Sequence, residues 1–230
     1  MKIAVLTGAG ISAESGIKTF RDADGLWEGH DIMEVASPDG WAANMELVLD
    51  FYNKRRAQLL TVEPNAAHHA LVSLEADHEV VIITQNVDNL HERAGSKNII
   101  HLHGELCKAR SVADESLIVD IRGDINKGDL AADGHQLRPH IVWFGEAVPA
   151  MDQAVAEVVD SDAVIIIGTS MQVYPAAGLV SYAPANCKIY YIDPRPHISP
   201  ELARLSRLRV IEDTAVNGLP PLVAKLISKT

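Results

Sequence analysis

Two histidines and one cysteine lie close together in residues 101–112, which read HLHGELCKARSV. Alternate side chains of a strand point to the same face, so His101 and His103 would be neighbours there. With Cys107 they could supply three zinc ligands, but a structural zinc usually has four, often in C-x-x-C pairs. The other cysteine, Cys187, is distant in the sequence. These residues by themselves leave three interpretations open: a metal site, a catalytic site and ordinary core.

A glycine-rich turn follows the apolar residues 2–7. Gly8, Gly10 and Ala13 match the G-x-G-x-x-G/A pattern, which combines a tight turn, close approach of the backbone to a pyrophosphate and close helix packing. Its place directly after a predicted strand favours dinucleotide binding over a plain turn. The usual second strand with its terminal acid is missing from residues 19–31, which disfavours a standard dehydrogenase.

Apolar runs alternate with amphipathic stretches along the chain. The predicted strands are residues 2–7, 79–84, 99–103, 163–168, 188–193 and 207–213, and the predicted helices are 41–60, 64–77, 151–162 and 219–229. This alternation predicts an α/β fold with a mostly parallel sheet and helices on both faces. Residues 108–136 show no period and predict a loop-rich insertion, and residues 30–46 are a second candidate for a small lobe or mobile loop.

Polar residues follow two of the predicted strands. They are Gln85, Asn86, Asp88 and His91 after residues 79–84, and Thr169 and Ser170 after residues 163–168. Any one of them could be a helix cap. Ligands of parallel sheets bind at the carboxyl ends of the strands, so the shared placement favours one ligand crevice.

The composition excludes several classes of protein. The chain has 230 residues, 47% of them hydrophobic, and a formal net charge of -11. This charge argues against general affinity for nucleic acid or anionic membranes. No apolar run reaches the length of about 18 residues that indicates a membrane span. Two cysteines and no signal-peptide pattern predict a cytoplasmic protein.

Five ordered blocks of the sequence resemble the sirtuins, which are NAD-dependent protein-lysine deacylases, and in particular the bacterial desuccinylase and demalonylase type. The blocks are residues 8–27, 84–95, 101–106, 139–146 and 168–179. The resemblance implies a single catalytic domain over residues 1–230, with a Rossmann-like sheet and a small lobe from about 28–66 and 105–140. NAD and an acyl-lysine protein or peptide would meet between the two parts.

The resemblance also implies roles for individual residues. His103 would be the general base, which suits a side chain whose pKa lies near neutrality, and His101 would be structural. The acyl oxygen would attack C1′ of the NAD ribose, with free lysine, nicotinamide and 2′-O-acyl-ADP-ribose as products. The implied NAD-binding residues are Gly8, Ala9, Gly10, Ser12, Ala13, Thr19, Phe20, Arg21, Trp27, Gln85, Asn86, Asp88, Gly168, Thr169, Ser170, Asp193 and Ala215. The peptide would add as a strand along Val142, Trp143, Phe144, Gly145 and Glu146.

Tyr52 and Arg55 lie three residues apart on a predicted helix and therefore share a face. A phenol and a guanidinium together suit a small carboxylate, because arginine binds it with two hydrogen bonds. The pair resembles the Tyr-x-x-Arg motif of sirtuins that remove succinyl and malonyl groups. A solvated arginine beside a half-buried tyrosine is the alternative.

Sirtuins usually hold a structural zinc on four cysteines, and this chain has only two cysteines. We therefore predict no zinc and a small lobe that packs around residues such as Leu117, Ile118, Val119 and Ile121. Two alternatives to deacylation are mono-ADP-ribosyl transfer and an NAD or ADP-ribose binding module. A generic NAD oxidoreductase is the least supported.

Overall fold

A six-stranded parallel sheet forms the larger part of the protein in the computed structural model, which describes residues 1–19, 26–27 and 29–228. The strands are β1 (Lys2–Thr7), β4 (Glu79–Thr84), β5 (Ile99–His101), β9 (Ala163–Ile167), β10 (Lys188–Ile192) and β11 (Leu208–Ile211). Their order is β11-β10-β9-β1-β4-β5. The chain builds outward from β1 on one side and then on the other, so the topological switch point lies between β1 and β9. The predicted parallel α/β fold is confirmed.

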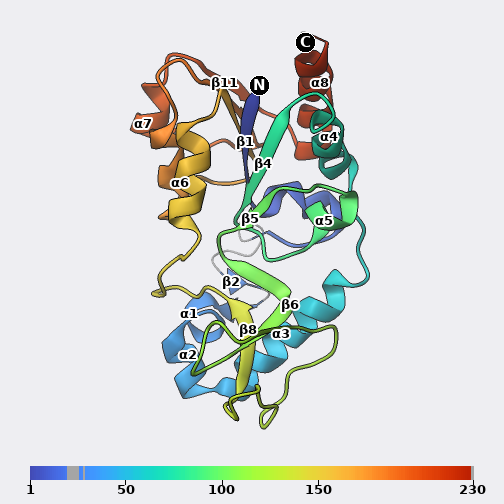
Figure 1. Cartoon of the computed structure of the whole chain (residues 1–230), viewed down its shortest axis with the longest axis vertical. Helices are drawn as coiled ribbons and strands as arrows, with labels where there is room; N and C mark the ends of the chain where they lie inside the picture. The colour runs from blue at the N-terminus through green and yellow to red at the C-terminus, as the bar shows by residue number, and fades with distance from the viewer. Residues whose placement is uncertain (20–25, 28, 229–230) are drawn as a thin grey trace.

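Helices cover both faces of this sheet (Figure 1). Ile3 and Val5 of β1 face a core shared with α4 (Ala66–Leu74) and α8 (Ala215–Ile227). Ala4 and Leu6 face the opposite core, shared with α6 (Met151–Val159) and η4 (Ala176–Tyr182). Burial on both faces is the reason that the strands are continuous apolar runs. No helix in the described part of the chain is both long and apolar enough to cross a bilayer.

A second group of elements lies below the sheet in the view of Figure 1. It contains α1 (Ile32–Val35), α2 (Pro38–Ala43) and α3 (Met45–Leu59), together with an antiparallel sheet of β6 (Gly104–Ser111), β7 (Ile118–Asp120) and β8 (Leu137–Ile141) in the order β7-β6-β8. The other strands and α-helices are the hairpin of β2 (Leu26–Trp27) and β3 (His30–Asp31), α5 (Leu90–Ala94) and α7 (Pro200–Ala203). We call the first group, α1 to α3 with β6 to β8, the small lobe.

One prediction about the helices of the small lobe is wrong. Residues 41–60 are not one helix, because Asn44 ends α2 and its side chain accepts a hydrogen bond from Leu47 N–H at the start of α3. Residues 108–136 are loop-rich as predicted, with two short stretches of strand where β6 continues to Ser111 and β7 pairs with it. All three residues of β7 are exposed, so this strand carries no alternating apolar signal.

The predicted packing of the small lobe also needs correction. Ile118 and Val119 are each 43% exposed, because they lie on the edge strand β7. The buried cluster at this end consists of Leu49, Ala109 and Ile125, with Ile121 and Leu137 packed against it. The lobe core thus forms between α3 and the inner strand β6.

Candidate active site

The turn after β1 and the turn after β9 interlock at the switch point. Gly8 N–H donates to the Ile167 carbonyl over 3.0 Å, and Gly10 N–H donates to the Gly168 carbonyl over 2.8 Å. A Cβ on Gly10 would lie 2.5 Å from the Gly168 Cα. Gly168 has a φ of +59°, which glycine adopts without strain. These glycines are therefore required for packing of one turn on the other, whatever they bind.

The helix expected directly after the glycine-rich turn is absent. Residues Ala9–Ile11 (η1) and Ala13–Ser15 (η2) form two short 3-10 turns instead. Ala13 is half-buried in the second turn, so its small size does not serve helix packing. The predicted NAD-binding residues Ala9 and Thr19 are also half-buried. Phe20, Arg21 and the side chain of Trp27 lie outside the described residues.

Ser12 joins two predicted cofactor residues at the end of β4. Its hydroxyl donates to Asp88 Oδ2 over 2.9 Å and accepts from Asn86 Nδ2 over 3.2 Å. All three side chains are buried. Burial raises the pKa of Asp88, although hydrogen bonds from Leu90 N–H and Ser12 oppose it. The structure thus brings three predicted residues from two segments into one polar group.

A second polar contact links the segments that follow β4 and β9. Gln85 Nε2 donates to Thr169 Oγ1 over 3.1 Å, and the Thr169 carbonyl accepts from the Tyr191 hydroxyl over 2.9 Å. Beyond Thr169 lies a cavity of about 370 Å³ lined by Ser170, Gln172, Arg195, Pro196 and His197. The buried Asp193 carboxylate accepts from Arg195 N–H over 2.8 Å. Ala215 is buried at the start of α8, where it belongs to the core on the α4 and α8 face.

His103 follows β5 in the turn before β6, with its ring half-buried. Nδ1 lies 3.0 Å from the Gln85 carbonyl oxygen. A carbonyl only accepts hydrogen bonds, so Nδ1 carries the hydrogen and Nε2 of the neutral ring keeps its lone pair. Burial lowers the pKa of His103, although the bond to Gln85 opposes it. The arrangement therefore favours a neutral imidazole whose Nε2 can accept a proton.

His101 occupies a different environment, although it is two residues away. Its Nε2 lies 2.6 Å from Glu92 Oε1 and its Nδ1 lies 3.4 Å from the Asn86 carbonyl oxygen. Burial opposes the charged form, but Glu92 outweighs it and raises the pKa of His101. Glu105 lies close enough to complete a three-residue cluster, but its carboxylate pairs with Lys108 over 2.7 Å. Ion pairs account for this cluster, so the structural role predicted for His101 fits the contacts.

A threonine pair beneath these residues escaped prediction. Thr7 and Thr84 face each other at the ends of β1 and β4, and Thr7 Oγ1 donates to Thr84 Oγ1 over 2.8 Å. Thr84 Oγ1 also accepts from Asn86 N–H over 3.0 Å, and His91 Nε2 lies 3.1 Å from Thr7 Oγ1. The available signal was that two buried apolar runs both end in threonine. The pair fixes the start of the segment that carries Asn86.

Tyr52 and Arg55 both lie on α3 and differ in exposure. Tyr52 is fully buried and its hydroxyl oxygen accepts from Trp143 Nε1 over 3.1 Å. Arg55 is half-buried, with its guanidinium carbon 5.2 Å from the centroid of the Phe51 ring. Tyr52 of the predicted acyl-pocket pair therefore contacts the predicted substrate segment through Trp143.

Residues 142–146 form a turn, and the addition of a substrate strand along them stays a prediction. Four of the five N–H groups donate within the protein: Val142 to the His103 carbonyl, Trp143 to Glu146 Oε2, Phe144 to the Ala36 carbonyl and Glu146 to the Trp143 carbonyl. Trp143 is 2% exposed, and the Glu146 carboxylate bonds to Arg138. Phe144 and Gly145 are exposed, so they remain candidates for peptide contact.

Arg56, the neighbour of Arg55, links three segments of the small lobe through hydrogen bonds. It is 1% exposed, and its Nε donates to the Leu106 carbonyl over 2.8 Å. Its Nη1 donates to Asn53 Oδ1 over 2.9 Å and to the Gly123 carbonyl over 3.1 Å. Helix α3, strand β6 and the loop after β7 therefore share one buried guanidinium.

We expect Arg56→Met to lower the free energy of unfolding by about 3 kcal/mol, because three hydrogen bonds from a charged group are lost and buried carbonyls lose their donor. Urea denaturation measures this change. Lys54→Met is the matched control, since Lys54 is exposed and its pair with Asp50 is worth about 0.5 kcal/mol or less. Equal stabilities of the two variants would contradict the role of Arg56.

The sequence model of the Sir2 family matches residues 8–175 of this chain. The chain belongs to the Sir2 family. A Helicobacter pylori protein described as an NAD-dependent protein deacylase is 58% identical over 226 residues, which cover 98% of this Sir2 protein and 97% of the relative. A solved Sir2 homologue in complex with NAD is 37% identical, with a TM-score of 0.87, and the match covers 99% of this chain and 90% of that one. Sir2 bound to an acetylated peptide is 28% identical, with a TM-score of 0.79 and coverage of 99% and 92%.

Proposed function

We propose that this Sir2 protein is an NAD-dependent protein-lysine deacylase that prefers acyl groups with a terminal carboxylate, such as succinyl and malonyl. The deacylase activity is supported by the family and by relatives that are more than half identical over most of the chain. A protein or peptide substrate is supported by the Sir2 structure with an acetylated peptide.

The residues present fit NAD. The glycines of the interlocked turns lie at the carboxyl ends of β1 and β9, beside the switch point of the parallel sheet, which is where ligands of such sheets bind. The cavity beside Ser170 and His197 has a volume in the range of small-molecule sites. When bound, NAD supplies an electrophilic ribose carbon and nicotinamide as the leaving group.

The hydrogen bond from His103 Nδ1 to the Gln85 carbonyl is the observation that carries the proposed activity. It fixes the tautomer in which Nε2 accepts a proton, and burial keeps the ring neutral near pH 7. His103 then removes a proton from a sugar hydroxyl, and Gln85 holds the ring in orientation. The Gln85 N–H donates to the Thr7 carbonyl, and the Gln85 side chain donates to Thr169. The residue that orients His103 is therefore itself held in place.

The preference for acidic acyl groups rests on Tyr52 and Arg55. A half-buried guanidinium binds a carboxylate more strongly than a solvated one, because water competes less. Burial raises the pKa of Tyr52, so the phenol stays protonated and remains a donor at neutral pH. An acetyl group has no carboxylate to use either donor.

We expect Arg55→Met to lower the ratio of kcat/KM for a succinyl-lysine peptide over the matched acetyl-lysine peptide by about 50-fold, because a charge-assisted hydrogen-bond pair is worth about 2–3 kcal/mol. Mass spectrometry of the peptides with NAD, together with nicotinamide release, measures both rates. Lys54→Met controls for the loss of one positive charge on the same helix.

An unchanged ratio in Arg55→Met would overturn the acidic preference and leave deacylation intact. Failure of the wild type to remove any acyl group, with NAD present, would overturn deacylation itself. ADP-ribosyl transfer to protein or simple NAD binding would then be the function to test.

A further inference from the structure

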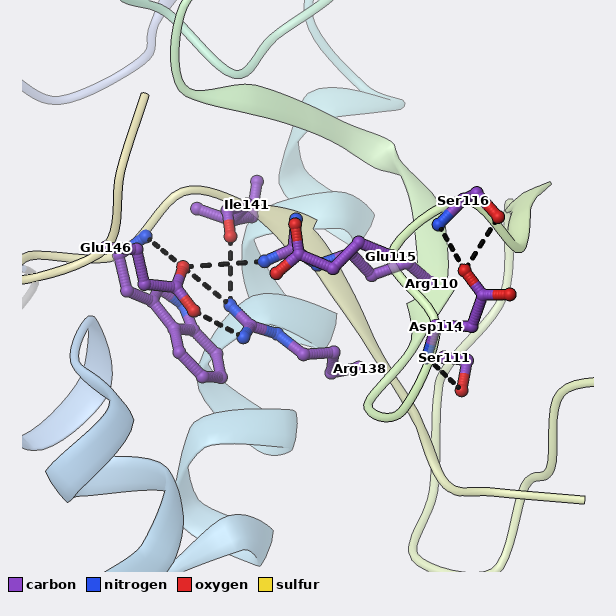
Figure 2. A network of polar contacts seen from close by, with 9 residues as sticks. Arg110, Ser111, Asp114, Glu115, Ser116, Arg138, Ile141 and Glu146 are labelled. Carbon is purple, nitrogen blue, oxygen red and sulfur yellow. Dashed lines mark hydrogen bonds and ion pairs between the residues drawn. The ribbon is translucent and has the colours of Figure 1, made fainter. Parts of the chain in front are cut away.

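A largely buried ion pair joins Arg138 and Glu146 (Figure 2), next to Trp143, which bonds to Tyr52 of the predicted acyl-pocket pair. Arg138 of β8 donates from Nη1 to Glu146 Oε1 over 2.6 Å and from Nη2 to Glu146 Oε2 over 3.1 Å. Nη2 also donates to the Ile141 carbonyl over 2.9 Å, and Arg138 is 8% exposed. This two-point geometry fixes the relative position of the strand end and the turn that follows it.

The pair holds Trp143 from two directions. The Arg138 guanidinium carbon lies 3.3 Å from the centroid of the Trp143 ring, which is a close cation–π contact. Glu146 Oε2 accepts from the Trp143 backbone N–H over 2.8 Å. Trp41 packs against the same indole at a centroid distance of 5.5 Å. Both the backbone and the ring plane of Trp143 therefore depend on the ion pair.

The fixed indole then determines the orientation of the Tyr52 hydroxyl. Indole N–H is only a donor, so the Tyr52 oxygen must accept the 3.1 Å hydrogen bond from Trp143 Nε1. The Tyr52 hydroxyl proton is directed elsewhere as a result. A tryptophan displaced by about 1 Å would lose this bond and allow the phenol to rotate.

We propose that Arg138 and Glu146 are positioning residues for acyl selectivity, which hold Trp143 so that Tyr52 presents its hydroxyl as a donor to the acyl carboxylate. This inference rests on the proposed function. In this role both residues act through Trp143 and not by direct contact with the acyl group. Glu146 acts on the site through Arg138 and Trp143. This role explains why the Glu146 carboxylate points toward Arg138, although Glu146 belongs to the predicted substrate segment.

Arginine suits this position for geometric reasons. Its planar guanidinium stacks on the indole and bonds to both carboxylate oxygens at once, whereas a lysine ammonium acts as a point charge. Arg138→Lys keeps the charge and one ion-pair contact, so the lobe is expected to fold. The change removes the stacking and the two-point geometry.

The matched control is Arg110 of β6. Arg110 Nη2 reaches the same Glu146 carboxylate over 3.5 Å, and its Nη1 reaches Glu115 over 3.4 Å. In the part of the chain that the structure describes, the Arg110 guanidinium pairs with these two carboxylates, whereas the cation over the Trp143 ring is Arg138. Arg110→Lys therefore changes the same ion-pair network without changing the stacking on the indole.

The test measures kcat and KM for matched succinyl- and acetyl-lysine peptides. We expect Arg138→Lys to lower the succinyl-to-acetyl ratio of kcat/KM about fivefold, mainly through the KM for the succinyl peptide, since one stacking contact and one aligned hydrogen bond are lost. Arg110→Lys should keep the wild-type ratio. In a Tyr52→Phe background, Arg138→Lys should cause no further loss, because the two residues act through one hydroxyl.

Two results would overturn the positioning role. One is that Arg138→Lys keeps the wild-type succinyl-to-acetyl ratio of kcat/KM, although Tyr52→Phe lowers this ratio. The other is independent addition of the two effects in the double variant. If Arg55→Met and Tyr52→Phe both keep the wild-type ratio, the acidic preference itself is overturned and the positioning role is overturned with it.

Discussion

His103→Ala will reduce kcat/KM for peptide deacylation about 1000-fold, which lies within the range of about 10²–10⁴ for the loss of a positioned general base. The reason is that His103 is the proposed general base, and the Gln85 carbonyl orients its ring so that Nε2 can accept the proton. Steady-state rates with an acyl-lysine peptide and NAD check this value. The folded state of the variant is checked by thermal denaturation.

The pH profile gives a second readout of the same residue. A general base works in its neutral form, and burial lowers the pKa of His103 below its ordinary value. The neutral form therefore persists to lower pH, and the acid limb of kcat/KM should lie below the ordinary histidine value of about 6.5. The limb should disappear in His103→Ala.

His101→Gln is the internal control, because His101 is two residues away and pairs with Glu92 instead. We expect its kcat/KM to stay within about threefold of the wild type, as for the loss of a partly exposed ion pair. A 1000-fold loss in His101→Gln, with an active His103→Ala, would reverse the assignment of the two histidines.

Gly168→Ala will destabilise the protein by about 3 kcal/mol, because a Cβ at this position is both strained and too close to backbone. The φ of Gly168 is +59°, and the added atom would lie 2.4 Å from Ile11 N and 2.5 Å from Gly10 C. Backbone atoms cannot rotate away as a side chain can. The turn after β1 must move instead, and a displacement of about 1 Å is expected to weaken NAD binding about 100-fold.

Gly134→Ala separates strain from overlap. Gly134 has a φ of +79°, but a Cβ there would meet no atom within 4 Å. This variant should lose about 1 kcal/mol and keep the NAD affinity of the wild type. Urea denaturation and NAD titration measure both variants. An NAD affinity in Gly168→Ala equal to that in Gly134→Ala would show that the interlocked turns do not form the cofactor site.

The central strands could be predicted from sequence because their environment is uniform. Residues 2–7 and 79–84 were predicted as strands, and β1 and β4 have these bounds. Each strand is covered on both faces, so burial alone produces a continuous apolar run. Strand β7 has no such environment, since all three of its residues are exposed at a sheet edge. Its pairing with β6 depends on the backbone and leaves no pattern in the side chains.

The candidate site divides in the same way. The residue types at the strand ends, and the family that they indicate, follow from the sequence because short ordered motifs carry them. His101 and His103 could be distinguished by family resemblance, but the hydrogen bonds to Glu92 and to the Gln85 carbonyl supply the physical difference. No local pattern contains those contacts.

The sequence by itself determined the parallel α/β fold, the Sir2 family and the residue types available for catalysis, since these depend on local periodicity and contiguous motifs. Only the tertiary structure decided that Glu146 faces Arg138, and that Trp143 bonds to Tyr52 across a separation of 91 residues. It also decided that Gly10 and Gly168 exclude any side chain between them. Such contacts join segments that are distant in the chain, so they exist only after packing has brought the two turns, the helix and the lobe strands together.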